Sequence, residues 1–260
     1  LEGLNKYTSM NSLKGKRVLI TRTVEDCAAW AAQLKNAGAI PVILPCISCE
    51  FIDEPTTKAH LMYALMEMDW VVFTSRRGVE AFVRFVEKTE CGALLAGTQI
   101  AVVGAATADA ALKLLDRVDL TAEVGTAESL SQTLAYRVKE NASPEQLTSR
   151  ILIAVAENAS SALEDNLTAA GNECTRLDVY RTVPINTCRV KQPLSELRAD
   201  KILLACPSAV TGLLNQIKVD TKVEIFTIGP STSRAAQVAE MAVAGEATNP
   251  SLEGLMETMR

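Results

Sequence analysis

Nucleotide-binding motifs are absent from this sequence of 260 residues. There is no G-x-x-x-x-G-K-S/T loop, and the glycines around positions 104 and 229 do not form G-x-G-x-x-G, so neither nucleoside triphosphates nor dinucleotides have a motif to bind. His60 is the only histidine, which excludes a histidine-rich metal site and any pair of catalytic histidines. Cys46 and Cys49 form a C-x-x-C pair, but no second pair lies at a suitable spacing. The sequence therefore predicts neither a metal nor a cofactor.

Long apolar runs and an excess of positive charge are absent as well. No apolar stretch approaches the roughly 20 residues that span a bilayer, and no segment has the pattern of a secretory leader. The formal net charge of -5 argues against a basic nucleic-acid surface, and the seven scattered cysteines are typical of a reducing compartment. We expect a cytoplasmic protein, with the plastid stroma as the alternative, that binds neither nucleic acid nor membranes. Residues 1–9, which precede Met10, are expected to be a tag remnant or the stub of a removed leader.

The chain contains one structural unit twice. The strand-like run "RVLIT" at 17–21 and the Ala-rich helical run after it recur as "RILIA" at 150–154 and a second helical run. In the same way, "DWVVFTSRRGVEAFVRF" at 69–85 parallels "ADKILLACPSAVTGLLNQI" at 199–217. Each half alternates strands with helices, and this alternation implies parallel sheets that are covered on both faces. The sequence predicts a doubly wound α/β fold.

Four turns carry small polar residues at the point where a strand-like run meets a helical one. They contain Thr74-Ser75, Thr107, Pro207-Ser208 and Ser231-Thr232. Sheets of this kind bind ligands at the carboxyl ends of their strands, and the N–H groups at helix N-termini favour anions there. Each hydroxyl could also simply cap its own helix. Four such turns at equivalent places favour a flexible ligand with several carboxylates.

Six further segments occur in the order and at the separations typical of one protein family. They are "DWVVFTSRRGVEAF", "VVGAATADA", "LDVYRTVP", "CPSAVTGLL", "IGPSTSRAA" and "NPSLEGLMETM". This ordered set resembles the uroporphyrinogen-III synthase family, from about Arg17 to Met259. The sequence departs from the pattern at Arg76, where many relatives have proline or glutamate, and at Cys206, which replaces a more usual serine.

The resemblance implies a fold and an activity. The activity is that of a monomeric, cofactor-free lyase that cyclises hydroxymethylbilane, a linear tetrapyrrole with many carboxylates, to uroporphyrinogen III. Water is lost and ring D is inverted through a spiro intermediate. The implied fold has two flavodoxin-like lobes with parallel sheets, joined by a two-stranded antiparallel linker. Residues 1–47 and 181–260 would form the first lobe, and residues 48–180 would form the second, inserted lobe.

The resemblance also points to individual site residues. Tyr180 matches the family's cleft tyrosine and is the candidate catalytic residue, as a hydrogen-bond donor to the departing hydroxyl. It could instead pack at the lobe junction in a structural role. The candidate substrate-binding residues, taken from the resemblance and from the polar turns, are Thr21, Arg22, Thr74, Ser75, Arg76, Thr107, Ser208, Ser231 and Thr232.

A polyanionic substrate also requires cations. We expect at least one of Arg22, Arg76, Arg77 and Arg181 to meet a substrate carboxylate, because each lies at or next to an expected cleft turn. The alternative function is a two-lobed binding module that closes on a small carboxylated ligand without chemistry. Isomer analysis of the product distinguishes the two.

Overall fold

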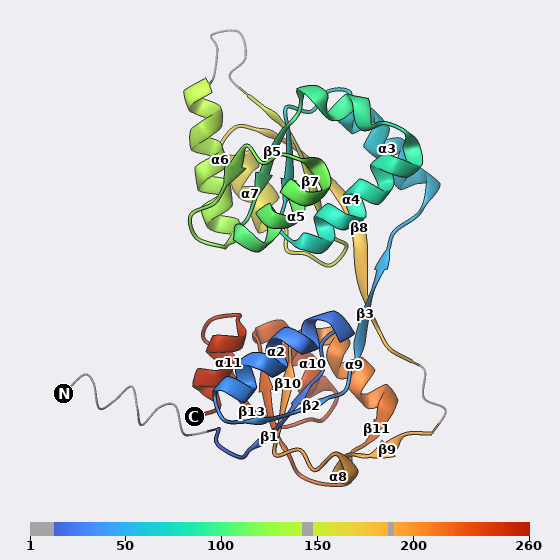
Figure 1. Ribbon diagram of the computed structural model, residues 1–260, viewed down its shortest axis with the longest axis vertical. Helices are drawn as coiled ribbons and strands as arrows, with labels where there is room; N and C mark the ends of the chain where they lie inside the picture. The colour runs from blue at the N-terminus through green and yellow to red at the C-terminus, as the bar shows by residue number, and fades with distance from the viewer. Residues whose placement is uncertain (1–12, 142–147, 187–189) are drawn as a thin grey trace, which may run out of the picture. The chain divides into compact units, whose positions relative to one another are not determined.

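The computed structural model describes residues 13–141, 148–186 and 190–260. Residues 1–9, whose origin was considered above, lie outside the described residues. The chain divides into two compact units, which we call unit 1 (Leu1–Cys49 with Thr182–Arg260) and unit 2 (Glu50–Arg181). Figure 1 shows both units with most of their elements labelled.

Unit 1 is built on a five-stranded parallel sheet. Its strands lie in the order β13-β12-β10-β1-β2. Counted along the chain this is the order 2-1-3-4-5 of flavodoxin-like folds, whose ligands bind outside the carboxyl ends of the strands. The strands are β1 (Arg17–Ile20), β2 (Ile40–Ile43), β10 (Lys201–Leu204), β12 (Glu224–Thr227) and β13 (Val243–Glu246).

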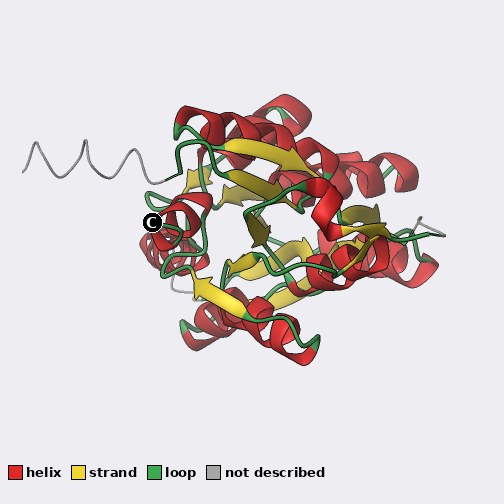
Figure 2. Cartoon of the chain, turned by 90° about the horizontal axis from the view of Figure 1, so that it is seen from below, coloured by secondary structure: helices red, strands yellow, loops and turns green. Residues whose placement is uncertain are grey.

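Helices cover both faces of this sheet. Figure 2 distinguishes the helices, strands and loops of the chain by colour. Because successive residues of a strand point to opposite faces, Val18 and Ile20 pack with α2 and α11, whereas Leu19 packs with α9 and α10. Two short strands, β9 and β11, pair separately. The remaining elements are α2 (Val24–Asn36), β9 (Gln192–Pro193), α8 (Leu194–Leu197), α9 (Pro207–Gln216), β11 (Ile217–Lys218), α10 (Pro230–Val238) and α11 (Leu252–Thr258).

Unit 2 has a six-stranded sheet in the order β3-β8-β7-β4-β5-β6, parallel from β8 to β6. If β7 is counted first, its five parallel strands repeat the order of unit 1. The strands are β3 (Ile47–Phe51), β4 (Trp70–Phe73), β5 (Gln99–Val102), β6 (Leu120–Thr121), β7 (Arg150–Ala156) and β8 (Glu173–Pro184). The helices are α3 (Pro55–Leu65), α4 (Arg76–Thr89), η1 (Gly92–Gly97), α5 (Ala105–Leu115), α6 (Ala127–Asn141) and α7 (Ala162–Ala169).

The two sequence repeats exchange strands between the units. The first repeat places β1 and β2 in unit 1 and β4, β5 and β6 in unit 2, and the second repeat does the reverse. The equivalence extends to single residues: Gly104 and Gly229 both cap the helix that follows their strand, in nearly the same extended conformation (φ 170° and 174°). Each sheet therefore needs strands from both repeats.

Two strands connect the units. β3 and β8 are hydrogen-bonded neighbours, and the N–H of Ile185 donates to Cys46 O (2.8 Å) while the N–H of Ile52 donates to Val179 O (3.1 Å). As the residue number increases along β3, the number of the paired residue on β8 decreases, so the two strands are antiparallel. The predicted fold class is confirmed: α/β, with parallel sheets and a two-stranded antiparallel connection.

Candidate functional site

The carboxyl ends of the parallel strands in unit 2 bring two of the predicted residues together. The hydroxyl of Tyr180, on β8, lies 3.2 Å from Ser75 Oγ, and either oxygen can be the donor. Ser75 follows β4, is the N-cap of α4 and accepts a hydrogen bond from the N–H of Gly78 (3.0 Å). A side chain on Gly78 would crowd Ala154 O and Ser75 Oγ, at 3.0 and 3.3 Å, so glycine lets the start of α4 approach β7. Ser75 therefore links Tyr180 to the N-terminus of a helix.

An irregularity in the sheet sets the direction of Tyr180. Val155 of β7 pairs with Asp178 of β8, but the next residue, Ala156, pairs with Tyr180, so the register skips Val179. Such a bulge re-aims a side chain that would otherwise point to the opposite face. Val179 is buried in the core beside α4 and α5, and Tyr180 packs against that same core while its hydroxyl reaches Ser75.

Arg176 fixes the loop that follows β7, next to Tyr180. Its Nε binds Asp178 (2.8 Å), one terminal nitrogen binds Glu164 (2.6 Å), and the other donates to carbonyl oxygens of the loop, the shortest of these bonds being to Ala156 O (2.9 Å). Burial lowers the pKa of Arg176, but the hydrogen bonds to Asp178 and Glu164 outweigh it and raise the pKa above the ordinary arginine value. The guanidinium is permanently charged and holds the loop in place.

The remaining polar residues of this edge differ in exposure. Thr74 is half-buried and Arg76, in the first turn of α4, is exposed. Arg181 forms ion pairs with Glu54 (3.1 Å) and Glu157 (3.9 Å), so its charge is partly neutralised within unit 2.

In unit 1, two predicted residues follow β1 and make internal contacts. The Thr21 hydroxyl donates to Leu203 O (2.6 Å) and the residue is 0% exposed, so its side chain ties β1 to β10. Arg22 binds Asp26 (2.7 Å) and lies over the ring of Trp30, 4.9 Å from its centroid. Its side chain remains partly accessible.

Two glycine-capped helices, α5 and α10, begin at the carboxyl ends of their strands. Glycine has no side chain to accept the first N–H groups, which are the anion-binding groups of a helix. The predicted Thr107 and Thr232 occupy the third position of these helices and are buried, at 4% and 1% exposure, whereas Ser231 is exposed. The two threonines are thus packed inside their turns, whereas Ser231 is an exposed residue of the α10 turn.

Ser208, in the first turn of α9, donates to Thr182 O on the connecting strand β8 (3.3 Å). The N-cap of that helix is Cys206, the residue that departs from the family pattern. Burial raises the pKa of its thiol, which stays protonated at neutral pH.

One group at the carboxyl edge of unit 1 was not predicted from the sequence. The hydroxyls of Thr227 and Ser233 lie 2.6 Å apart, and Ser233 donates to the exposed carboxylate of Glu246. This series of hydrogen bonds connects the first turns of α10 to β13. No local pattern signals it, because it depends on β13 lying beside β12.

The described part of the chain contains neither a cluster of metal-binding side chains nor a membrane-spanning helix. Over residues 13–141, 148–186 and 190–260, no three His, Cys, Asp or Glu side chains form a group that could hold a metal ion. Over the same ranges no helix combines the length and apolar character needed to cross a bilayer. The side chain of His60 lies outside the described residues.

Comparison with known proteins identifies the family of the chain. A family model described as uroporphyrinogen-III synthase HemD matches residues 28–257. The chain belongs to the uroporphyrinogen-III synthase family. Enzymes of this family are lyases of tetrapyrrole biosynthesis that cyclise hydroxymethylbilane. The family predicted from the six ordered segments is therefore confirmed.

Relatives of the chain come from distant organisms. It is 29% identical to the porphyrin biosynthesis protein HemD of Ruminiclostridium josui, over 86% of this chain but only 44% of that protein, so the chain spans less than half of that relative. It is 28% identical to a putative uroporphyrinogen-III synthase of Methanocaldococcus jannaschii, over 85% of this chain and 88% of that protein. The chloroplastic uroporphyrinogen-III synthase of Oryza sativa subsp. japonica is 26% identical, over 98% and 83%.

Solved structures of the family share the fold. The uroporphyrinogen-III synthetase of Helicobacter pylori superposes with a TM-score of 0.57 at 15% identity, over 93% of this chain and 97% of that one. A mutant uroporphyrinogen III synthase of Thermus thermophilus gives a TM-score of 0.55 at 18% identity, over 93% and 96%. At these identities the likeness supports the fold alone.

Proposed function

We propose that this family member converts hydroxymethylbilane into uroporphyrinogen III, with units 1 and 2 as its two lobes and Tyr180 as the catalytic residue. The observation that carries the proposal is the hydrogen-bonded pair of Tyr180 and Ser75 at the carboxyl edge of the sheet. In this fold class that edge is where ligands bind. The substrate is a linear tetrapyrrole, which agrees with the family.

The proposed chemistry requires little beyond orientation and one hydrogen bond. Loss of the hydroxyl from the substrate's hydroxymethyl group leaves a cation that the pyrrole stabilises. The substituted carbon of ring D attacks this cation, and the resulting spiro intermediate fragments and closes in the inverted sense. The protein holds the chain in the folded conformation. Tyr180 hydrogen-bonds to the departing hydroxyl and gives it the phenol proton, so that it leaves as water. Ring D loses a proton when it closes the macrocycle, and this proton restores the phenol.

Ser75 orients this donor. Its oxygen already accepts the N–H of Gly78 (3.0 Å), so its own hydrogen can be directed to the Tyr180 oxygen, 3.2 Å away. The phenol hydrogen of Tyr180 is then directed toward the substrate. Because Gly78 lies in the first turn of α4, the positive end of the helix dipole also favours the transfer of charge toward the phenol oxygen.

The substrate carboxylates would bind at the polar turns of both units. We assign direct contacts to the accessible residues and assign to the buried ones a role in holding the turns whose N–H groups face the ligand. The direct set is Thr74, Ser75, Arg76, Ser208, Ser231 and Arg22, and the turn-holding set is Thr21, Thr107 and Thr232. Arg22 and Arg181 are already ion-paired with carboxylates, so substrate must compete for them.

We propose further that the enzyme acts as a monomer without a cofactor, in the cytoplasm or, alternatively, in the plastid stroma, and binds neither nucleic acid nor membranes. The acidic composition, with a net charge of -5, supports the last point. Sedimentation of the purified chain tests whether it is a monomer.

The test is to supply freshly generated hydroxymethylbilane and to separate the type III from the type I isomer, which forms spontaneously. The chain should yield type III, and Tyr180→Phe should lower its rate roughly 100-fold while the fold is retained. Ser75→Asn keeps a good N-cap for α4 but changes the partner of the phenol, so it should lower kcat without loss of stability. Tyr136→Phe, at an exposed tyrosine of α6, is the matched control.

Three outcomes contradict parts of this proposal. Type I as the sole product would leave a binding module as the function. A fully active Tyr180→Phe would remove Tyr180 from the chemistry. An unfolded Tyr180→Phe would make Tyr180 structural.

A further inference from the structure

A hollow lies in unit 1, away from the carboxyl edge of the sheet. It is a pocket of about 700 Å³ at the amino ends of the strands, where Ile202, Ile225 and Val243 begin or nearly begin β10, β12 and β13. The polar turns of unit 1 occupy the opposite edge, so the two are separated by the length of the strands. The size falls within the range of small-molecule sites.

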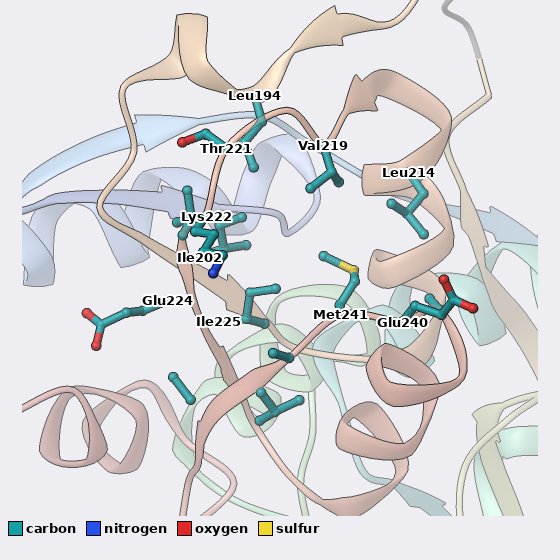
Figure 3. A pocket seen from close by; sticks show the side chains of 15 residues that line it. Leu194, Ile202, Leu214, Val219, Thr221, Lys222, Glu224, Ile225, Glu240 and Met241 are labelled. Carbon is teal, nitrogen blue, oxygen red and sulfur yellow. The ribbon is translucent and has the colours of Figure 1, made fainter.

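The wall of the pocket is apolar. All but four of the fifteen residues that line it are apolar. Figure 3 shows Leu194, Leu214, Val219, Ile225 and Met241 pointing into the same space, from different elements of unit 1 and from the segment after β11. Ile225 and Met241 are buried, at 6% and 8% exposure, whereas Val219, also in the wall, is 53% exposed. A ligand that passes Val219 would meet buried apolar side chains.

Four residues of the wall are polar, and three of these are charged. They are Thr221, Lys222, Glu224 and Glu240. Glu224 forms an ion pair with Lys201 (2.6 Å), and Figure 3 shows the carboxylates of Glu224 and Glu240 directed away from the centre of the pocket. Asp220, next to the wall, is held by the hydroxyl and N–H of Ser195. Lys222 is therefore the cation that the wall offers to a ligand.

We propose that this pocket binds a small molecule with an apolar body and one acidic group, the body against Ile225, Leu214 and Met241 and the acid paired with Lys222. Apolar burial supplies the binding energy, and the lysine selects an anion over a neutral or cationic analogue. The site is independent of the proposed catalytic function, because it uses none of the residues assigned to that function.

Two fluorescent probes with similar bodies test the proposal on the full chain. 1-Anilinonaphthalene-8-sulfonate carries an acidic group, and N-phenyl-1-naphthylamine lacks it. The sulfonate should bind saturably with one site per chain. Lys222→Glu should weaken the sulfonate about tenfold and the neutral probe less than about twofold, since the variant removes an ion pair with the sulfonate and adds a repulsion, and neither acts on the neutral probe. Lys218→Glu, just outside the wall, should change neither.

A second pair of variants tests the location. Val219→Trp enlarges an exposed side chain of the wall and should weaken both probes, whereas Val238→Trp places the same side chain at an 81% exposed position outside the wall and should not. The proposal is overturned if sulfonate binding does not saturate, if Lys222→Glu and Lys218→Glu act alike, or if the two tryptophan variants act alike. Melting curves of all four variants confirm that each is folded, and Lys222→Glu is a surface change that tests the site even if Val219→Trp fails to fold.

Discussion

Arg176 is the residue whose removal should most clearly destabilise unit 2. Its side chain is 27% exposed, and that of its partner Glu164 is 14% exposed. Arg176→Met keeps most of the apolar stem but leaves Glu164 without its cation and removes the donor to the carbonyl oxygens of the β7–α7 loop. Loss of one partner of a buried pair costs about 3–5 kcal/mol, and loss of an exposed pair about 0–1 kcal/mol. Partial exposure places the expected loss at about 2–4 kcal/mol.

The two tryptophans allow the measurement to be confined to unit 2. Trp30 lies on α2 of unit 1 and Trp70 on β4 of unit 2, and the chain has no others. In a Trp30→Phe background, fluorescence therefore follows Trp70 through urea unfolding. Arg150→Met is the matched control in the same sheet, because its pair with Glu67 is 41% and 67% exposed and should contribute less than about 1 kcal/mol.

A double variant distinguishes the effect of the uncompensated Glu164 charge from the effect of the lost Arg176 hydrogen bonds. Glu164 Oε2 is buried with no hydrogen-bond partner among the described residues, so the carboxylate depends on Arg176 for compensation. Replacing Glu164 by glutamine in the Arg176→Met background removes the uncompensated charge and should restore part of the lost stability. Equal losses for Arg176→Met and Arg150→Met would refute the reasoning.

Two further predictions concern Gly212 and Asp220, both in unit 1. Gly212→Ala should destabilise the chain by about 1–3 kcal/mol, since a Cβ would lie 1.8 Å from Cys46 O, whereas Gly97→Ala, with open space around it, should be nearly neutral in urea unfolding. Hydrogen bonds from Ser195 lower the pKa of Asp220 below its usual value, so this contact stabilises the fold above the usual aspartate pKa and is lost as the pH falls through the lowered one. NMR titration should show the Asp220 pKa rising toward normal in Ser195→Ala, and an unchanged value would contradict this.

The fold class could be predicted from sequence because its signals are local. The apolar runs and the turn residues of each repeat identify strands and helices wherever they occur in the chain. The alternation of these elements then requires parallel sheets with two covered faces. Even the repeat is visible by eye, since Gly104 and Gly229 occupy equivalent turns.

The arrangement of the site could be predicted from the sequence only in part. Ser75 and Tyr180 are 105 positions apart, and their contact depends on the bulge that skips Val179. A bulge follows from packing between strands and leaves no fixed pattern in either of them. Likewise, Thr21 follows a strand just as Thr74 does, but the sequence does not reveal that its hydroxyl is used by the neighbouring strand.

The exchange of strands between repeats makes the chain indivisible. A gene split between α6 and β7 would give one fragment ending with the first repeat and another starting with the second. The break would run between β1 and β10 in one sheet, and between β3 and β8 and between β4 and β7 in the other. β10 and β4 are buried along their whole length, so each fragment would present bare apolar edges to water. Neither copy could have served as a free-standing ancestor in its present form, and the two halves should regain structure only when they are expressed together.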